Sequence, residues 1–169
     1  MQLIFAFVVF AFLIIESLRA SANERAQRAR GGREPAGDVY TVMRIVYPGA
    51  FLAMFAEGAW RGAPPGAAVL AGLLVFLAAK ALKWWAILSL GPFWTFRVIV
   101  VPGSTLVTRG PYRYHFFRHP NYIGVMGELA GVAVMTGALV SGVAGFATFA
   151  VLVWKRISVE EHALRQAVR

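Results

Sequence analysis

The residues best suited to chemistry gather in one segment, Arg109–Gly124, which reads RGPYRYHFFRHPNYIG. This segment holds three arginines, two histidines and three tyrosines, and it leads into an apolar stretch. Arg118 supplies a fixed charge, and His119 supplies an imidazole ring that can carry a proton. Pro120 suits the first turn of a helix, and Gly124 permits close approach to the backbone. We therefore expect a reaction site where this segment enters a helix at a membrane surface.

A second polar cluster, RISVEE at Arg156–Glu161, follows the last apolar stretch. Arg156 and Glu160 are four residues apart and share a helix face. An ordinary surface ion pair, contributing ~0.3–0.5 kcal/mol, would explain that spacing. In a reaction site, the same arginine would hold a carboxylate through two parallel hydrogen bonds.

Metal and nucleotide sites receive little support from the sequence. His115 and His119 have the i,i+4 spacing of a ligand pair, but Pro120 disfavours helix at the preceding residue and a third ligand is not apparent. A Gly-x-Gly-x-x-Gly loop does not occur, and strands do not alternate with helices. We therefore predict no metal site and no Rossmann-type cofactor site.

The composition is that of a membrane protein. Hydrophobic residues make up 59% of the 169 residues, and the mean hydropathy is +0.63. The absence of cysteine excludes disulfides, thiolate zinc sites and thiol nucleophiles. The formal charge of +9 lies mainly in the joints between apolar stretches, which favours anionic membrane lipid over nucleic acid as the partner.

Five stretches are apolar enough to be predicted as spans: Met1–Leu18, Val39–Trp60, about Ala67–Leu90, about His119–Ala138, and a last one that ends near Trp154. The joints Arg19–Asp38 and Gly91–Arg118 and the tail Lys155–Arg169 hold thirteen of the seventeen lysines and arginines. The turn Arg61–Gly66 holds one. The positive-inside rule then predicts an N-terminus outside and a C-terminus inside the cell.

The predicted fold is all-α, a multi-pass membrane domain over residues 1–169. Residues 1–90 form three spans, and residues 91–169 form the cofactor-binding and catalytic part. The joint Gly91–Arg118 is expected to pack beneath the membrane domain or to re-enter it, lining a cavity. The last two spans form a hairpin with a helical cytoplasmic tail, which brings His119 near Arg156. Gly127 and Gly131 form a Gly-x-x-x-Gly face for an internal helix contact or a dimer.

Several polar residues inside or beside the predicted spans have ordinary structural explanations. Glu16 is expected at the interface, and Lys80, Lys83 and Trp94 are expected as anchors at the level of the lipid headgroups. Glu128 is expected to make a buried hydrogen bond, with a place in the wall of a substrate tunnel as the alternative.

Around Arg109–Gly124 and Arg156–Glu161 the chain resembles the isoprenylcysteine carboxyl methyltransferase family, and in particular its short bacterial members. The resemblance implies a place in a bacterial inner membrane. The family consists of integral-membrane enzymes that use S-adenosylmethionine. The matching segments are ALKWWAILSLGPFWTFRVIVVPGSTLVTRGPY, RHPNYIG and RISVEEHAL, in matching order over about Ala81–Leu164. The Arg-His-Pro motif by itself is shared with phospholipid N-methyltransferases.

The resemblance implies a set of residues for the methyl donor and the acceptor. Glu160 would contact the donor as a catalytic residue, and Arg156 would be catalytic and bind the substrate carboxylate. Arg97 matches a further donor position. This sequence has RYHFF between Tyr112 and Arg118, two residues more than most relatives, so Tyr114 is an alternative to Tyr112. The residues that would border the donor are Ser104, Thr105, Leu106, Val107, Tyr112, His119, Pro120, Asn121, Tyr122 and Glu160.

We therefore predict an S-adenosylmethionine-dependent O-methyltransferase that acts on the carboxylate of a hydrophobic, isoprenylcysteine-like acceptor. A carboxylate with a pKa near ~4 is ionised at neutral pH and needs no strong base. A phenol or enol acceptor would need one, with His119 or Glu160 as the candidate. Phospholipid N-methylation on the same scaffold and a non-catalytic membrane scaffold are the two rivals. The sequence does not indicate the oligomeric state.

Overall fold

The computed structural model describes residues 2–62, 64–114 and 118–167, and this part of the chain is helical with no strand, so the predicted all-α class is confirmed. Its elements are α1 (Gln2–Ala29), α2 (Tyr40–Arg61), α3 (Gly66–Leu90), the 3₁₀ turns η1 (Gly91–Phe93) and η2 (Gly110–Arg113), α4 (Pro120–Thr136) and α5 (Leu139–Ala167).

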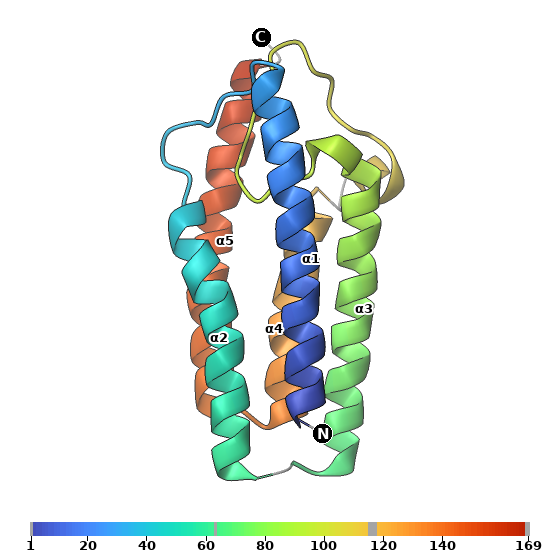
Figure 1. Cartoon of the computed structure of the whole chain (residues 1–169), viewed down its shortest axis with the longest axis vertical. Coiled ribbons are helices and arrows are strands. Elements are labelled where there is room, and N and C mark those ends of the chain that lie inside the picture. The colour runs from blue at the N-terminus through green and yellow to red at the C-terminus, as the bar shows by residue number, and fades with distance from the viewer. Residues whose placement is uncertain (1, 63, 115–117, 168–169) are drawn as a thin grey trace.

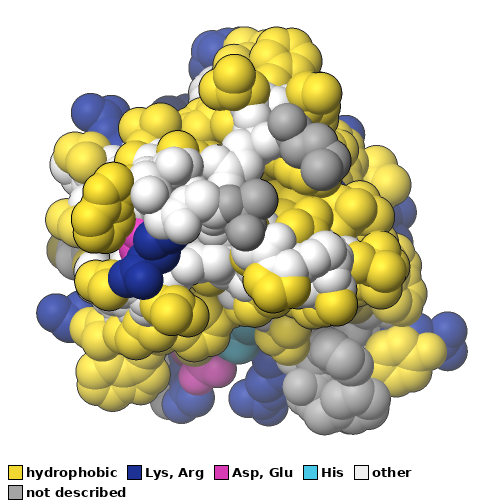
Figure 2. Space-filling view, turned by 90° about the horizontal axis from the view of Figure 1, so that it is seen from below, with side chains coloured by type: hydrophobic (Ala, Val, Ile, Leu, Met, Phe, Trp, Pro, Cys, Tyr) yellow, Lys and Arg dark blue, Asp and Glu magenta, His cyan; other side chains and the backbone are white. Residues whose placement is uncertain are grey.

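The five α-helices run roughly side by side as one elongated bundle (Figure 1). Both long joints lie at the end of the bundle that also holds the C-terminus, and the N-terminus lies at the opposite end with the α2–α3 turn (Figure 1). Seen from that opposite end, the molecule shows mostly hydrophobic side chains (Figure 2). The basic joints and the tail predicted to share one side of the membrane therefore share one end of the fold.

Four of the described helices, α1, α2, α3 and α5, are long and apolar enough to cross a membrane. The fourth predicted span, about His119–Ala138, corresponds to α4, which has 17 residues and is therefore ~26 Å long, less than a ~30 Å hydrocarbon core. The structure therefore shows a multi-pass helical protein with four full-length candidate spans and a shorter helix packed among them.

Close packing of α3 against α4 depends on glycines. A Cβ atom on Gly131 would lie 2.6 Å from the backbone nitrogen of Phe76, and one on Gly72 would lie 2.3 Å from that of Met135. A Cβ on Gly127 would lie 2.7 Å from the Cβ of Ala79. The predicted Gly-x-x-x-Gly face thus serves an internal helix contact, where small residues let two backbones approach.

The hairpin between α4 and α5 is confirmed. Gly137 closes α4 in the left-handed conformation, with φ of +68°, which glycine adopts without steric cost. The carboxylate of Glu57 in α2 then accepts hydrogen bonds from the backbone nitrogens of Val140 and Ser141, at 3.0 and 2.6 Å. These bonds satisfy donors that the first turn of α5 would otherwise leave unpaired.

The first helix is longer than predicted. The predicted first span ends at Leu18, whereas α1 continues to Ala29, so the expected loop from Arg19 is wrong over its first part. The side chain of Asn23 donates to the carbonyls of Gly91 and Trp94, and that of Gln27 donates to the carbonyl of Pro92. Polar residues that looked like a solvated joint therefore fasten α1 to the turn after α3.

The longer helix also corrects the expected place of three charges. Glu16 is fully buried in the middle of α1, and its carboxylate oxygens lie 3.0 and 2.7 Å from the ammonium groups of Lys80 and Lys83. Lys83 lies seven residues before the end of α3, ~10 Å along the helix. The two lysines therefore point into the bundle and are not headgroup anchors.

Glu128 belongs to the same buried group. Its carboxylate lies 3.0 Å from Lys80 and accepts a 2.6 Å hydrogen bond from the hydroxyl of Tyr47. The expectation of a buried hydrogen bond is confirmed, and the partner is an intramembrane cluster of four charges.

Candidate active site

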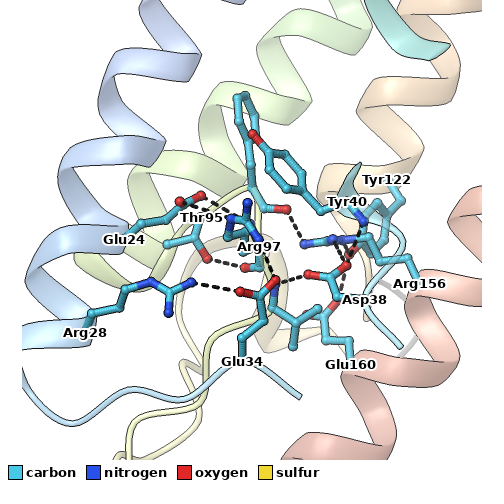
Figure 3. Close-up of polar contacts among 12 residues, drawn as sticks. Glu24, Arg28, Glu34, Asp38, Tyr40, Thr95, Arg97, Tyr122, Arg156 and Glu160 are labelled. Carbon is cyan, nitrogen blue, oxygen red and sulfur yellow. Dashed lines mark hydrogen bonds and ion pairs between the residues drawn. The ribbon is translucent and has the colours of Figure 1, made fainter. Parts of the chain in front are cut away.

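At the centre of the polar end, four side chains from three parts of the sequence are joined by polar contacts (Figure 3). The Arg156 guanidinium in α5 donates from Nε to the Tyr122 hydroxyl of α4, at 2.9 Å. That hydroxyl donates to Glu160, at 2.8 Å. On its other side, Arg156 Nη1 lies 2.5 Å from Asp38 Oδ1, in the joint between α1 and α2. The hairpin therefore brings together the two motifs that lie about forty residues apart.

His119 lies beside these four side chains, at the start of α4. Its Nε2 lies 3.4 Å from Glu161 Oε1, and its ring centroid lies 5.8 Å from that of Tyr122. The predicted neighbourhood of His119 and Arg156 at one end of the bundle agrees with the structure. The predicted i,i+4 ion pair between Arg156 and Glu160 does not, because the acid that pairs with Arg156 is Asp38.

A polar cavity opens beside the four joined side chains, and the joint between α3 and α4 forms much of its wall. The joint therefore packs under the bundle and lines a cavity, as expected. All the predicted donor residues except Pro120, which is buried in the first turn of α4, contribute to the lining. They are Ser104, Thr105, Leu106, Val107, Tyr112, His119, Asn121, Tyr122 and Glu160, together with Arg97 and Arg156.

Tyr112 and Tyr114, the two alternatives from the sequence, lie in different surroundings. Tyr112 lies in η2 and lines the cavity, whereas Tyr114 is 42% exposed and stacks against the guanidinium of Arg113. Burial and the nearby charge of Glu160 both raise the pKa of the Tyr112 phenol, so it stays protonated at neutral pH. Tyr112 thus contributes a neutral hydroxyl group to the wall of the cavity.

A second cavity lies deeper in the bundle and is mostly apolar. Side chains of all five α-helices line it, including Phe10, Met43, Lys83, Val125 and Phe149. Four residues, Thr95, Asn121, Tyr122 and Arg156, line both this cavity and the polar one. The two cavities therefore meet at the Tyr122–Arg156 hydrogen bond.

Sequence reasoning missed two contributions to this site. Asp38 lies 118 positions from Arg156 in a joint of mixed charge, and its type and spacing gave no signal. Trp94, expected as an interfacial anchor, is 2% exposed, and its indole nitrogen donates to the Asn121 carbonyl oxygen at 3.2 Å. A helix N-terminus predicted at Pro120 could have suggested that Asn121 points into the site.

The joint that holds Asp38 is fastened to the joint after α3 by further polar contacts. The backbones of Arg33 and Val100 form an antiparallel bridge. Arg97 Nη1 lies 2.7 Å from Glu34, which also pairs with Arg28 at 2.8 Å (Figure 3). Two segments about sixty residues apart thus pack against each other, and the second of them lines the polar cavity.

The described residues contain no group of three potential metal-binding side chains. Of the histidine pair weighed from the sequence, His115 lies outside the described residues. The polar cavity instead suits an organic molecule that carries both signs of charge, because the described residues of its lining hold one carboxylate, three guanidinium groups and several aromatic rings: Glu160, Arg97, Arg118, Arg156, Tyr112, Tyr122 and Trp94.

The fold and the site together define a multi-pass helical membrane protein with a polar cavity at one end and an apolar cavity inside the bundle. The model of the "Isoprenylcysteine carboxyl methyltransferase (ICMT) family" matches residues 70–166, more than half of the chain. The chain belongs to this family, and the family implies a membrane methyltransferase.

Two bacterial relatives match along most of their length. "Uncharacterized protein YpbQ" of Bacillus subtilis is 31% identical over 164 residues, covering 94% of this chain and 96% of the relative. An "Uncharacterized protein" of Haemophilus influenzae is 23% identical over 143 residues, covering 84% and 82%. No solved structure matches the chain.

Proposed function

We propose that this membrane methyltransferase moves the methyl group of S-adenosylmethionine onto an oxygen of a lipophilic acceptor. The observation that supports this is the meeting of a polar and an apolar cavity at Thr95, Asn121, Tyr122 and Arg156. A water-soluble donor and a lipid-soluble acceptor require such a pair of compartments with one shared wall. Catalysis then consists mainly of holding the reacting groups in line and excluding water.

Residues of the polar cavity fit the donor, whose sulfonium supplies an activated methyl group when it is bound. Glu160 would contact its ammonium or ribose, and backbone groups of Ser104–Val107 would contact its adenine or carboxylate. The face of Tyr122 would favour the positive sulfonium over the neutral sulfide product. Pro120 would act indirectly, by starting the helix that presents Asn121 and Tyr122.

The acceptor would lie in the apolar cavity with its reacting oxygen toward Arg156. Its carboxylate, held by the guanidinium, is the first candidate, because it is already ionised and needs no base. An isoprenylcysteine or another lipid-linked acid has this chemistry. Such an acceptor would enter sideways from the membrane between helices.

A hydroxyl acceptor is the second candidate, and one observation favours it. Each nitrogen of Arg156 already has a protein acceptor: the Tyr122 hydroxyl, Asp38 or the carbonyl of Phe96. A phenol or enol would need a base that removes its proton, and not a guanidinium that holds a carboxylate. Glu160 and His119 lie next to Tyr122, which belongs to the wall shared by the two cavities, so either could serve as that base.

The decisive experiment measures donor binding and methyl transfer with the purified protein in lipid nanodiscs. We expect saturable binding of S-adenosylmethionine and labelled product from farnesylcysteine analogues or from long-chain phenols. Glu160→Gln should weaken donor binding about tenfold, as expected for the loss of one charge-assisted contact. Glu161→Gln is the matched control, since Glu161 is adjacent but does not line the polar cavity.

The same assay tests the two rivals. Label in extracted phospholipid and not in acids or phenols would establish phospholipid N-methylation. The absence of any saturable donor binding would establish a non-catalytic scaffold and refute the proposal.

We also propose that the site faces the cytoplasm of a bacterial inner membrane, with the N-terminus outside. Because the chain has no cysteine, single cysteines report the orientation directly. In intact cells a membrane-impermeant thiol reagent should label Gly66→Cys, in the α2–α3 turn, and should not label Thr108→Cys, in the joint after α3. The reverse pattern would place the site outside.

A further inference from the structure

Asp38 is a buried carboxylate held in a fixed position. Its side chain is 3% exposed. Oδ1 accepts a hydrogen bond from the backbone nitrogen of Tyr40 at 3.0 Å, and Oδ2 accepts one from that of Val98 at 2.9 Å. Two backbone donors from different joints therefore aim this carboxylate at Arg156, as Figure 3 shows.

The contact neutralises the guanidinium where the two cavities meet. Arg156 Nη1 lies 2.5 Å from Asp38 Oδ1, Nη2 donates to the carbonyl of Phe96, and Nε donates to the Tyr122 hydroxyl. The Arg156 side chain is 5% exposed, so water screens this pair little. A second carboxylate arriving in the apolar cavity would meet a neutral pair, with the negative charge of Glu160 nearby.

We propose that Asp38 occupies the place on Arg156 that an acceptor carboxylate would need, and so sets the site to prefer acceptors that are uncharged at the reacting oxygen. This inference rests on the proposed function, because it concerns the acceptor of that same site. Asp38 is here a specificity-determining residue: it touches Arg156 and acts on the acceptor through it.

A purely structural role makes a different prediction. If Asp38 only ties the joint between α1 and α2 to α5, its loss lowers stability and affects all ligands alike. If it sets acceptor charge, its loss changes the ratio between a charged and an uncharged ligand of the same shape. The ratio is therefore the informative quantity, since it does not depend on how much protein is folded.

The probes are N-acetyl-S-farnesylcysteine and its carboxamide, which differ at the carboxyl group alone. Equilibrium binding is measured in nanodiscs with S-adenosylhomocysteine present. The wild-type protein should bind the carboxamide at least as tightly as the acid. Asp38→Asn should shift the acid-to-carboxamide affinity ratio toward the acid by about tenfold, the change that one regained charge-assisted contact of ~1.4 kcal/mol gives.

Glu34→Gln is the matched control. Glu34 lies in the same joint and pairs with Arg97 at 2.7 Å, so its loss also loosens the joint while leaving the Asp38–Arg156 pair intact. Its affinity ratio should equal that of the wild type. Asp38→Glu keeps the charge and should also retain the wild-type ratio.

An unchanged ratio in a folded Asp38→Asn protein overturns the inference, and so does an equal shift in Glu34→Gln. If Asp38→Asn does not fold, the wild-type ratio decides, and tighter binding of the acid than of the carboxamide overturns the inference. Donor binding is measured separately. Its absence in the wild type would refute the proposed function, whereas an unchanged ratio with donor binding intact would refute the role of Asp38 alone.

Discussion

Two buried charged clusters differ in what surrounds them. The interior cluster consists of Glu16, Lys80, Lys83 and Glu128, with Tyr47, and the terminal cluster consists of Asp38, Arg156, Tyr122 and Glu160. In each, a tyrosine hydroxyl donates to a glutamate, at 2.6 Å in the interior and 2.8 Å at the end. The chemistry is similar, and only the terminal cluster lies where both cavities meet.

The interior cluster balances itself. Two carboxylates and two ammonium groups face one another, and all four side chains are at most 7% exposed. They join α1 and α4 to α3, and the hydroxyl of Tyr47 adds α2. Charges inside a membrane are costly unless they are paired, so this arrangement stabilises one packing of four helices. Lys83 and Tyr47 of this cluster border the apolar cavity alone, so neither buried charge nor one neighbouring cavity marks a reaction site. The terminal cluster differs because it lies where both cavities meet.

The largest predicted effect comes from breaking the interior cluster. Glu128→Leu leaves Lys80 and Lys83 with a single carboxylate, and removing one partner of a buried ion pair costs about 3–5 kcal/mol. We expect a large drop in the thermal unfolding midpoint in detergent. In the fraction that folds, donor affinity should stay within about twofold of the wild type, since Glu128 does not line the polar cavity.

Glu161→Leu provides the comparison for this experiment. Glu161 is also a glutamate with basic neighbours, but its side chain is 34% exposed, and exposed pairs contribute about 0–1 kcal/mol. Its unfolding midpoint should hardly change. If Glu128→Leu instead left stability intact and abolished donor binding, the interior cluster would belong to the reaction site and the contrast between the clusters would be wrong.

The difference between the clusters also explains how far the sequence could predict this molecule. Hydropathy and basic joints were enough for the helices, the α4–α5 hairpin and the approach of His119 to Arg156. These depend on patterns along the chain. Asp38 escaped because the contact joins residues 118 positions apart, and nothing in its surroundings marks it.

The interior charges escaped for a related reason. Lys80 and Lys83 near an apolar stretch read equally well as headgroup anchors, and the choice depends on where Glu16 lies. That position follows from α1 continuing to Ala29, which the polar residues after Leu18 disguised. Polar side chains that cap a neighbouring turn resemble solvent-exposed ones until the tertiary contact is known.

The matched tyrosines sharpen the comparison with a smaller effect. Tyr47→Phe and Tyr122→Phe each remove one hydroxyl that donates to a glutamate, and one such hydrogen bond contributes about 0.5–1.5 kcal/mol, more when an ion accepts it. Tyr47→Phe should lower the unfolding midpoint and leave the kcat for methyl transfer nearly unchanged, because it keeps the ring that lines the apolar cavity and removes only the hydroxyl bound to Glu128. Tyr122→Phe should lower kcat about tenfold with a smaller change in midpoint, because it separates Arg156 from Glu160.

Both variants are measured for melting and for turnover on the same preparation. Equal losses of turnover in the two variants would mean that the interior cluster also positions the reacting groups. A loss of stability alone in Tyr122→Phe would mean that the terminal cluster only ties α4 to α5, and would count against the proposed site.

The smallest predicted effect concerns acid, at the rim of the terminal cluster. Burial acts to raise the pKa of Glu34, but the hydrogen bonds from Arg97 and Arg28 outweigh it and hold that pKa below its usual value of 4.5. A carboxyl group with a lowered folded-state pKa contributes stability that is present above its unfolded pKa and is lost as the pH falls through the folded one. Wild-type and Glu34→Gln proteins should therefore differ most in free energy of unfolding between pH 5 and 7, by about 0.2–1 kcal/mol, and the difference should fade as the pH falls below 4.5 through the lowered pKa. Melting curves of both proteins across this range give the difference, because the contributions of all other carboxylates cancel. A stability difference that grew in acid would mean that Glu34 is protonated in the folded protein and does not fasten the joint that holds Asp38.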